Sequence, residues 1–148
     1  MPSSPRPSTA PVGYTAFVQL HRRDYEMYAS ARLADSKLAA SVVAEVLRRA
    51  ELSWNTLMLR ENPLALTWRA LRDSVTTART HTHDPQADVL HRTLPGQPAD
   101  AVLLREGLGM DTKSAAALMG MGEPELHMQF QAARRLLAGR GHGRQGAA

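Results

Sequence analysis

Three arginines repeat at helical spacing in the middle of the chain. Arg69, Arg72 and Arg79 fall on one face of a segment that has the pattern of an amphipathic helix. A guanidinium donates two parallel hydrogen bonds to a phosphate, and a row of guanidiniums can follow a nucleic-acid backbone. The spacing predicts a phosphate-binding face. The alternative interpretation is a solvated helix face with scattered ion pairs.

Histidines and an aspartate gather in a polar segment, as His81, His83, Asp84 and His91. These residue types bind metals, but no ligand motif or helical spacing supports a site, so we expect no metal. The chain has no cysteine, which excludes thiolate ligands and a cysteine nucleophile. It also lacks a glycine-rich phosphate loop and any recognisable serine hydrolase motif. The sequence therefore predicts a protein that is not an enzyme and that has no cofactor.

The chain is short and mildly basic. Its 148 residues are enough for one ordinary domain or two small ones, and neither half could bury a large catalytic core. The net charge of +4 comes from 18 basic and 14 acidic residues, and lysine occurs only at positions 37 and 113. No apolar run approaches the length of a membrane span. Together with the lack of cysteine, this favours a cytoplasmic protein that does not contact membranes.

Helical periodicity runs through the N-terminal half. A first helix is expected from Tyr14 to about Ala34, and Asp35 is placed to cap the next helix. Asn62 followed by Pro63 is typical of a helix start, because the missing proline amide costs nothing in the first turn. The apolar residues of the second and third helices each fall on one face, which predicts a common core: Val42, Val43, Val46, Leu47 and Ala50, then Leu64, Trp68, Leu71, Val75 and Ala78.

The segment from Leu94 to Leu137 ends in the pattern of a helix-turn-helix. A short apolar helix precedes the tight corner Gly120-Met121-Gly122, and a second amphipathic helix follows it. The apolar positions of the two helices are Ala115, Ala116, Leu118 and Met119, then Leu126, Phe130, Ala133 and Leu137.

The predicted fold class is all-α, with two small helical domains joined by a linker and a helix-turn-helix in the second domain. The periodicity breaks at the linker, and the C-terminal end is glycine-rich and basic. The predicted ranges are a disordered lead at 1–13, the first domain at 14–79, the linker at 80–93, the helix-turn-helix domain at 94–138 and a disordered tail at 139–148.

Two strings in the C-terminal half carry a family resemblance, LREGLGM at 104–110 and ARRLL at 133–137. Without gaps from Leu104 to Leu137, this half resembles the promoter-reading domain of extracytoplasmic-function (ECF) RNA polymerase sigma factors. The N-terminal half resembles the family's other helical domain through YTAF at 14–17, VVAEVLRR at 42–49 and NPLALTWRALRD at 62–73.

The resemblance implies a transcription initiation factor that binds core RNA polymerase and directs it to promoter DNA. An anti-sigma factor is a further implied partner. The implied polymerase-binding residues are Glu45, Arg48 and Arg49. The implied DNA-binding residues are Arg69, Arg72, Arg79, His127, Gln129, Gln131, Arg134 and Arg135.

The chain departs from the family pattern at both of its implied binding faces. Glu123 and Glu125 occupy the first turn of the recognition helix, where they stabilise the helix dipole but repel phosphates. Ala40, Ser41 and Ala44 stand where the family carries an acidic run and a glutamine for polymerase. The alternative is therefore a degenerate sigma-like regulator that lost its DNA grip and binds a protein partner. A third hypothesis is a helix-turn-helix repressor unrelated to polymerase.

Overall fold

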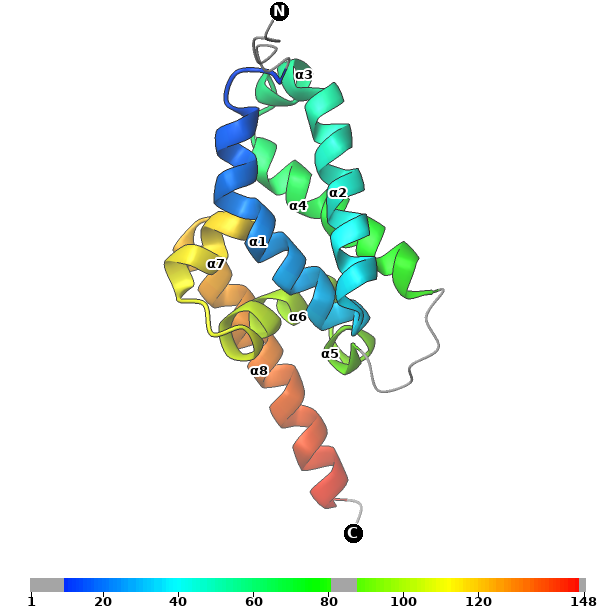
Figure 1. Ribbon diagram of the computed structural model, residues 1–148. Helices are drawn as coiled ribbons and strands as arrows, with labels where there is room; N and C mark the ends of the chain where they lie inside the picture. The colour runs from blue at the N-terminus through cyan, green and yellow to red at the C-terminus, as the bar shows by residue number, and fades with distance from the viewer. Residues whose placement is uncertain (1–9, 81–87, 147–148) are drawn as a thin grey trace, which may run out of the picture.

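The computed structural model describes residues 10–80 and 88–146, with side chains as far as residue 140, and every regular element in these ranges is helical (Figure 1). The all-α prediction is confirmed. Within the described residues, no helix is both long enough and apolar enough to cross a bilayer. The elements are α1 (Tyr14–Leu33), α2 (Ser36–Leu52), α3 (Trp54–Met58), α4 (Pro63–Arg79), α5 (Val89–Thr93), α6 (Gly96–Val102), the π-helical turn η1 (Leu103–Gly107), α7 (Thr112–Met119) and α8 (Glu123–Gly146).

The helices α2 and α4 begin at the side-chain caps that the sequence predicts. The Asp35 side chain accepts a hydrogen bond of 3.0 Å from Leu38 N, and the Asn62 side chain accepts one of 3.0 Å from Ala65 N. The predicted apolar faces of these helices are turned inward, where Val43 and Leu71 are fully buried. As a result α1 packs along α2, and α4 packs against both of them (Figure 1).

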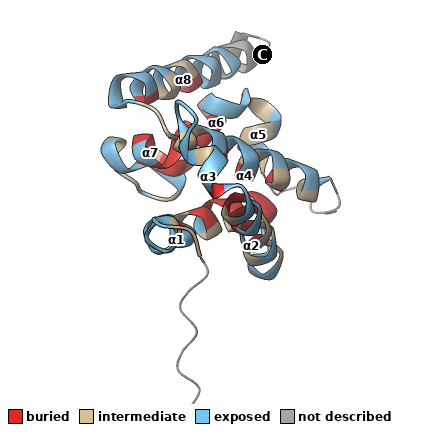
Figure 2. Cartoon of the chain, turned by 90° about the horizontal axis from the view of Figure 1, so that it is seen from above, coloured by how far each residue is buried: buried red, intermediate tan, exposed pale blue. Residues whose placement is uncertain are grey.

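One hydrophobic core runs through both halves of the chain. Tyr25, Tyr28 and Leu71 from the first half belong to the same buried cluster as Leu118 and Leu126 from the second half. Figure 2 shows the buried parts of α1, α2, α4 and α7 facing the interior of the molecule. The two predicted domains therefore share a core, and separate folding of either half stays a prediction.

The helices α7 and α8 meet at the predicted corner, and α8 then extends beyond it. Leu126 and Ala133 are buried as the periodicity predicts, but Leu137 is 37% exposed. The C-terminal end of α8 continues past the other helices in Figure 1. The helix also continues to Gly146, where we expected a tail from residue 139. Because the preceding turns of α8 are already formed, the extension needs no new nucleation, although each glycine in it costs about 1 kcal/mol relative to alanine.

The expected linker and lead are partly built into the fold. Residues 81–87 lie outside the described residues, but Asp88 starts α5, and its side chain is 3% exposed. At the other end, Trp54 Nε1 donates a hydrogen bond of 2.8 Å to Val12 O, which ties the last residues of the lead to α3. Asp88 pairs with Arg32, and Val12 with Trp54. Both partners are distant in the sequence, so local periodicity cannot indicate these contacts.

Candidate functional site

The turn between α7 and α8 is held against the first turn of α4. Asn62 Nδ2 donates a hydrogen bond of 2.8 Å to Gly120 O, while Asn62 Oδ1 caps α4. Gly120 has a φ of +73°, a left-handed conformation that glycine adopts without strain. An added Cβ would lie 2.3 Å from Ala65 N. Only glycine therefore allows the turn to approach α4 this closely.

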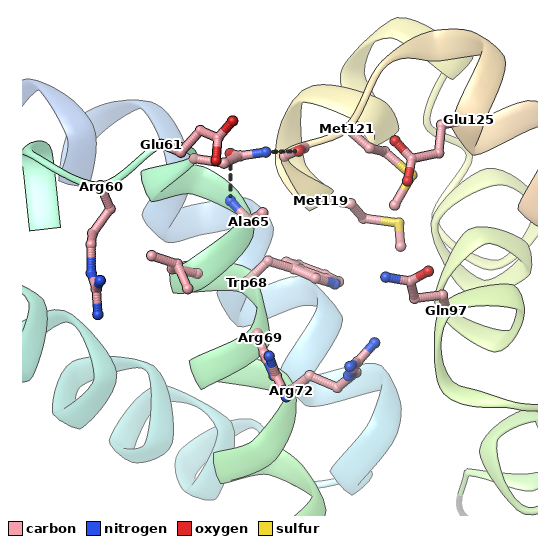
Figure 3. Close-up of a pocket in the computed structure, with 13 residues that line it drawn as sticks. Arg60, Glu61, Ala65, Trp68, Arg69, Arg72, Gln97, Met119, Met121 and Glu125 are labelled. Carbon is pink, nitrogen blue, oxygen red and sulfur yellow. Dashed lines mark hydrogen bonds between the residues drawn. The ribbon is translucent and has the colours of Figure 1, made fainter.

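An open cavity of 620 Å³ lies beside this contact, between α4, the α7–α8 turn and the start of α6 (Figure 3). Trp68 and Met119, which are 3% and 2% exposed, form its floor. Arg69 and Arg72 reach the cavity from α4, and Glu125 reaches it from the first turn of α8. In Figure 3 the two guanidiniums and the Glu125 carboxylate lie at opposite ends. The volume is that of a small-molecule site.

The three arginines of the predicted phosphate-binding face have different surroundings. Arg69 is exposed and makes no ion pair with another described residue. Arg72 is 23% exposed, and its Nη1 lies 3.8 Å from Asp100 Oδ2. Arg79 is half-buried in the last turn of α4 and does not line the cavity. The structure thus brings Arg69 and Arg72 together but separates them from Arg79.

The buried carboxylate of Asp100 lies behind Arg72. Asp100 is fully buried, and it accepts hydrogen bonds from Tyr28 Oη at 2.6 Å and from Trp68 Nε1 at 3.1 Å. His91 Nε2 lies 2.5 Å from Asp100 Oδ1. Burying a carboxylate without partners is costly, so these donors compensate the loss of water. Asp100 thereby connects α1, α4 and α5 to its own helix, α6.

A second buried carboxylate, that of Asp88, extends this network. Arg32 Nε and Nη2 each lie 3.0 Å from Asp88 Oδ2, and Arg32 Nη1 donates to Tyr28 Oη at 3.1 Å. His91 Nδ1 lies 2.6 Å from Asp88 Oδ1, an ion-pair distance at an angle outside the hydrogen-bond range. Both ring nitrogens of His91 thus face carboxylate oxygens, an arrangement that favours the protonated ring.

The two carboxylates shift the titration of His91. Burial acts to lower the pKa of His91, but Asp100 and Asp88 outweigh burial and raise this pKa above its usual value. Burial likewise acts to raise the pKa of Asp88, but His91 and Arg32 outweigh it and lower this pKa. The same burial, together with Asp100, raises the pKa of Tyr28, so the phenol remains protonated.

We expect the network to make stability depend on pH. Because the pKa of His91 is raised by folding, its contribution is fully present below the unfolded value of about 6.5 and is lost as pH rises through the folded value. Asp88, whose pKa is lowered, contributes above about 3.9 and loses its contribution as pH falls. The melting temperature, followed by circular dichroism from pH 5 to 9, should therefore fall towards the alkaline end.

Comparing the pH dependence of the melting temperature between variants separates the contribution of His91 from that of His21. Burial lowers the pKa of His21, so His21 adds stability as pH rises, with the opposite sign. The variant His91→Gln should remove the alkaline loss, whereas His127→Gln, at an exposed position of α8, should keep it. An unchanged alkaline slope in His91→Gln would show that His91 is not the titrating group.

The predicted DNA-binding residues of α8 lie away from the cavity. His127, Gln131 and Arg135 are exposed, and Gln129 is half-buried. Arg134 Nη1 lies 4.0 Å from Glu106 Oε1, and the guanidinium of Arg134 lies 5.7 Å from the centre of the Phe130 ring. None of these five side chains lines the cavity that Arg69 and Arg72 share.

The predicted polymerase-binding residues pair with one another on the surface of α2. Arg48 Nη2 lies 2.7 Å from Glu45 Oε1, and Arg49 Nε lies 3.1 Å from the same oxygen. The hydrogen bonds from Arg48, assisted by those from Arg49, lower the pKa of Glu45 to about 2. All three side chains are exposed, so this cluster is accessible to a partner.

Sequence reasoning missed the buried network. It assigned no role to Asp88 or Asp100, and it considered His91 only as a metal ligand in a linker. Two signals were present: Asp88 and His91 stand one helical turn apart, and Asp100 is the single acid in the otherwise uncharged segment 94–104. His81 and His83, like Asp84, lie outside the described residues.

Comparison with known proteins does not assign a family or a function to this chain. No family model matches this sequence, and neither a curated protein nor a solved structure matches it.

Proposed function

We propose that this chain is a sigma-like transcription regulator of the cytoplasm that acts by binding a protein partner and no longer binds promoter DNA. Core RNA polymerase and an anti-sigma factor are the partner candidates. One observation carries the proposal. Glu125, in the first turn of the recognition helix, lines the same cavity as Arg69 and Arg72, the arginines expected to face DNA.

This arrangement is unfavourable for DNA binding. A recognition helix inserts its first turns into the major groove, so those turns have to be free of other protein. Here the corner at Gly120 is docked on α4 through Asn62, and a cavity of 620 Å³ is far too small for a duplex. Glu125 at the start of α8 and the arginines of α4 therefore line one cavity while the halves remain packed.

The charge of the helix-turn-helix also disfavours DNA. Its segment 111–138 holds three basic and three acidic residues, so it lacks the charge surplus that releases counterions from DNA. Glu123 and Glu125 are both exposed in the first turn of α8. Met128 is 68% exposed and Leu136 is 45% exposed on the same helix. Exposed flexible apolar side chains of this kind suit protein recognition.

A second candidate is a sigma-like initiation factor that directs core polymerase to promoter DNA. The exposed side chain of Arg69 and the exposed cluster of Glu45, Arg48 and Arg49 favour it, because the resemblance assigns these residues to promoter and polymerase. It requires α7 and α8 to leave α4 before DNA is bound.

A charge-reversal experiment separates the two candidates. The wild-type chain should show no duplex binding by fluorescence anisotropy at low salt, while core polymerase or an anti-sigma protein co-purifies with it from its native cell. The variant Glu123→Lys with Glu125→Lys should gain salt-dependent DNA affinity. Lysines there attract phosphates and also repel Arg69 and Arg72 across the cavity.

The matched control reverses the same charge elsewhere. Asp24→Lys with Asp73→Lys changes side chains of α1 and α4 outside the helix-turn-helix, and it should gain much less affinity. Tight duplex binding by the wild-type chain at physiological salt would favour the initiation factor. Equal gains in the two double variants would show that the first turn of α8 is not the DNA-facing surface.

A further inference from the structure

When His91 is protonated, the buried network behind the cavity holds one more cation than anions. Arg32, His91 and Arg72 face the carboxylates of Asp88 and Asp100. The side chains of all but Arg72 are at most 6% exposed, whereas that of Arg72 is 23% exposed. The surplus positive charge is thus accessible at Arg72, on the wall of the cavity, with Arg69 one helical turn away on α4.

The opposite end of the cavity carries negative charge. Glu125 lines it from α8 and Glu61 lines it from the residues before α4, and neither makes an ion pair with another described residue. Figure 3 draws both carboxylates on the side of the α7–α8 turn and the Arg72 guanidinium on the other side, next to Gln97. Charges of opposite sign therefore line one open cavity, and Arg60 is a further cation in its lining.

The surface between the charged ends is apolar. Met119 and the edge of Trp68 form the floor, and Met121 adds a second thioether near Glu125 (Figure 3). Thioether side chains adapt to apolar groups of different shape. An apolar floor with a few convergent polar groups is typical of sites for small molecules.

We propose that the cavity binds a small zwitterion of the amino-acid or short-peptide class. Its carboxylate pairs with Arg69 and Arg72. Its ammonium group pairs with Glu125, and its apolar side chain packs against Met119. Such a ligand joins α4 to the first turn of α8, and it therefore stabilises the packed arrangement of the two halves.

The experiment uses the full chain and three probes that share one dipeptide and differ in their charged ends. The dipeptide alanyl-phenylalanine carries both charges, its N-acetyl derivative lacks the cation, and its C-terminal amide lacks the anion. Isothermal titration calorimetry should give saturable binding of the dipeptide with a Kd of about 1 mM or tighter, and each derivative should bind about tenfold more weakly. The dipeptide should also raise the melting temperature.

Substitutions in the protein test which end of the cavity binds each charged group of the dipeptide. Arg69→Gln should reduce dipeptide affinity to that of the amide, and Glu125→Gln should reduce it to that of the N-acetyl derivative. The controls Arg23→Gln on α1 and Glu123→Gln on α8 change exposed residues outside the cavity and should leave affinity unchanged. Absence of saturable binding, equal binding of the three probes, or equal losses in the controls would each overturn the proposal.

Discussion

Replacing Asp100 with alanine is expected to remove a large share of the stability of the fold. The substitution leaves His91 and Arg72 without a fully buried carboxylate, and it leaves Tyr28 and Trp68 without an acceptor. Breaking a buried ion pair from one side costs about 3 to 5 kcal/mol. A domain of this size has a free energy of unfolding of about 5 to 15 kcal/mol. Urea denaturation followed by circular dichroism measures the loss.

Two companion variants identify the cause of that loss. Asp100→Asn keeps an acceptor for either Tyr28 or Trp68, which donate to different oxygens of Asp100, and removes the charge, so its stability should lie between those of the wild type and Asp100→Ala. Asp73→Ala, at an exposed position of α4, should change the free energy of unfolding by no more than about 0.5 kcal/mol. If Asp100→Ala lost no more than Asp73→Ala, the network would not hold α5 and α6 to the first half.

Gly120→Ala should be the second strongly destabilising substitution. The left-handed backbone at this position costs alanine about 1 to 2 kcal/mol. The added Cβ would also lie 2.3 Å from Ala65 N, and relieving such an overlap typically costs about 1 to 3 kcal/mol more. Together these effects predict a loss of about 2 to 5 kcal/mol in the free energy of unfolding, measured by urea denaturation.

Gly109 offers a matched control for this substitution. Its φ is +69°, close to that of Gly120, but an added Cβ would have nothing within 4 Å. Gly109→Ala should therefore show only the backbone cost of about 1 to 2 kcal/mol. The difference between the two variants measures the contact between the α7–α8 turn and α4. Equal losses would mean that the contact contributes nothing.

The parts of the fold that depend on local pattern were predictable from the sequence. Asn62 before Pro63 indicated the start of α4, and the apolar stripe around Val43 indicated the buried face of α2. Gly120 indicated the corner between α7 and α8. In each case the deciding interaction joins residues within one or two helical turns, which spacing can reveal.

The parts that depend on distant contacts were not predictable. Arg32 and Asp88 are 56 positions apart, and Tyr28 and Asp100 are 72 positions apart. Nothing near Asp88 or Asp100 in the sequence distinguishes a paired buried carboxylate from a solvated one. The same limitation applies to the cavity, because helical spacing aligned Arg69 with Arg72 but could not show that Glu125 faces them.

The docking of Gly120 on Asn62 sets a threshold for any molecule that needs the face of the α7–α8 turn that α4 covers. Such a molecule can bind only the fraction of chains in which the corner has detached, so its apparent affinity is its intrinsic affinity multiplied by that fraction. Every 1.4 kcal/mol of docking free energy raises the concentration it needs about tenfold. The contact between the α7–α8 turn and Asn62 can in this way set the concentration at which a partner binds, without altering the surface that the partner recognises.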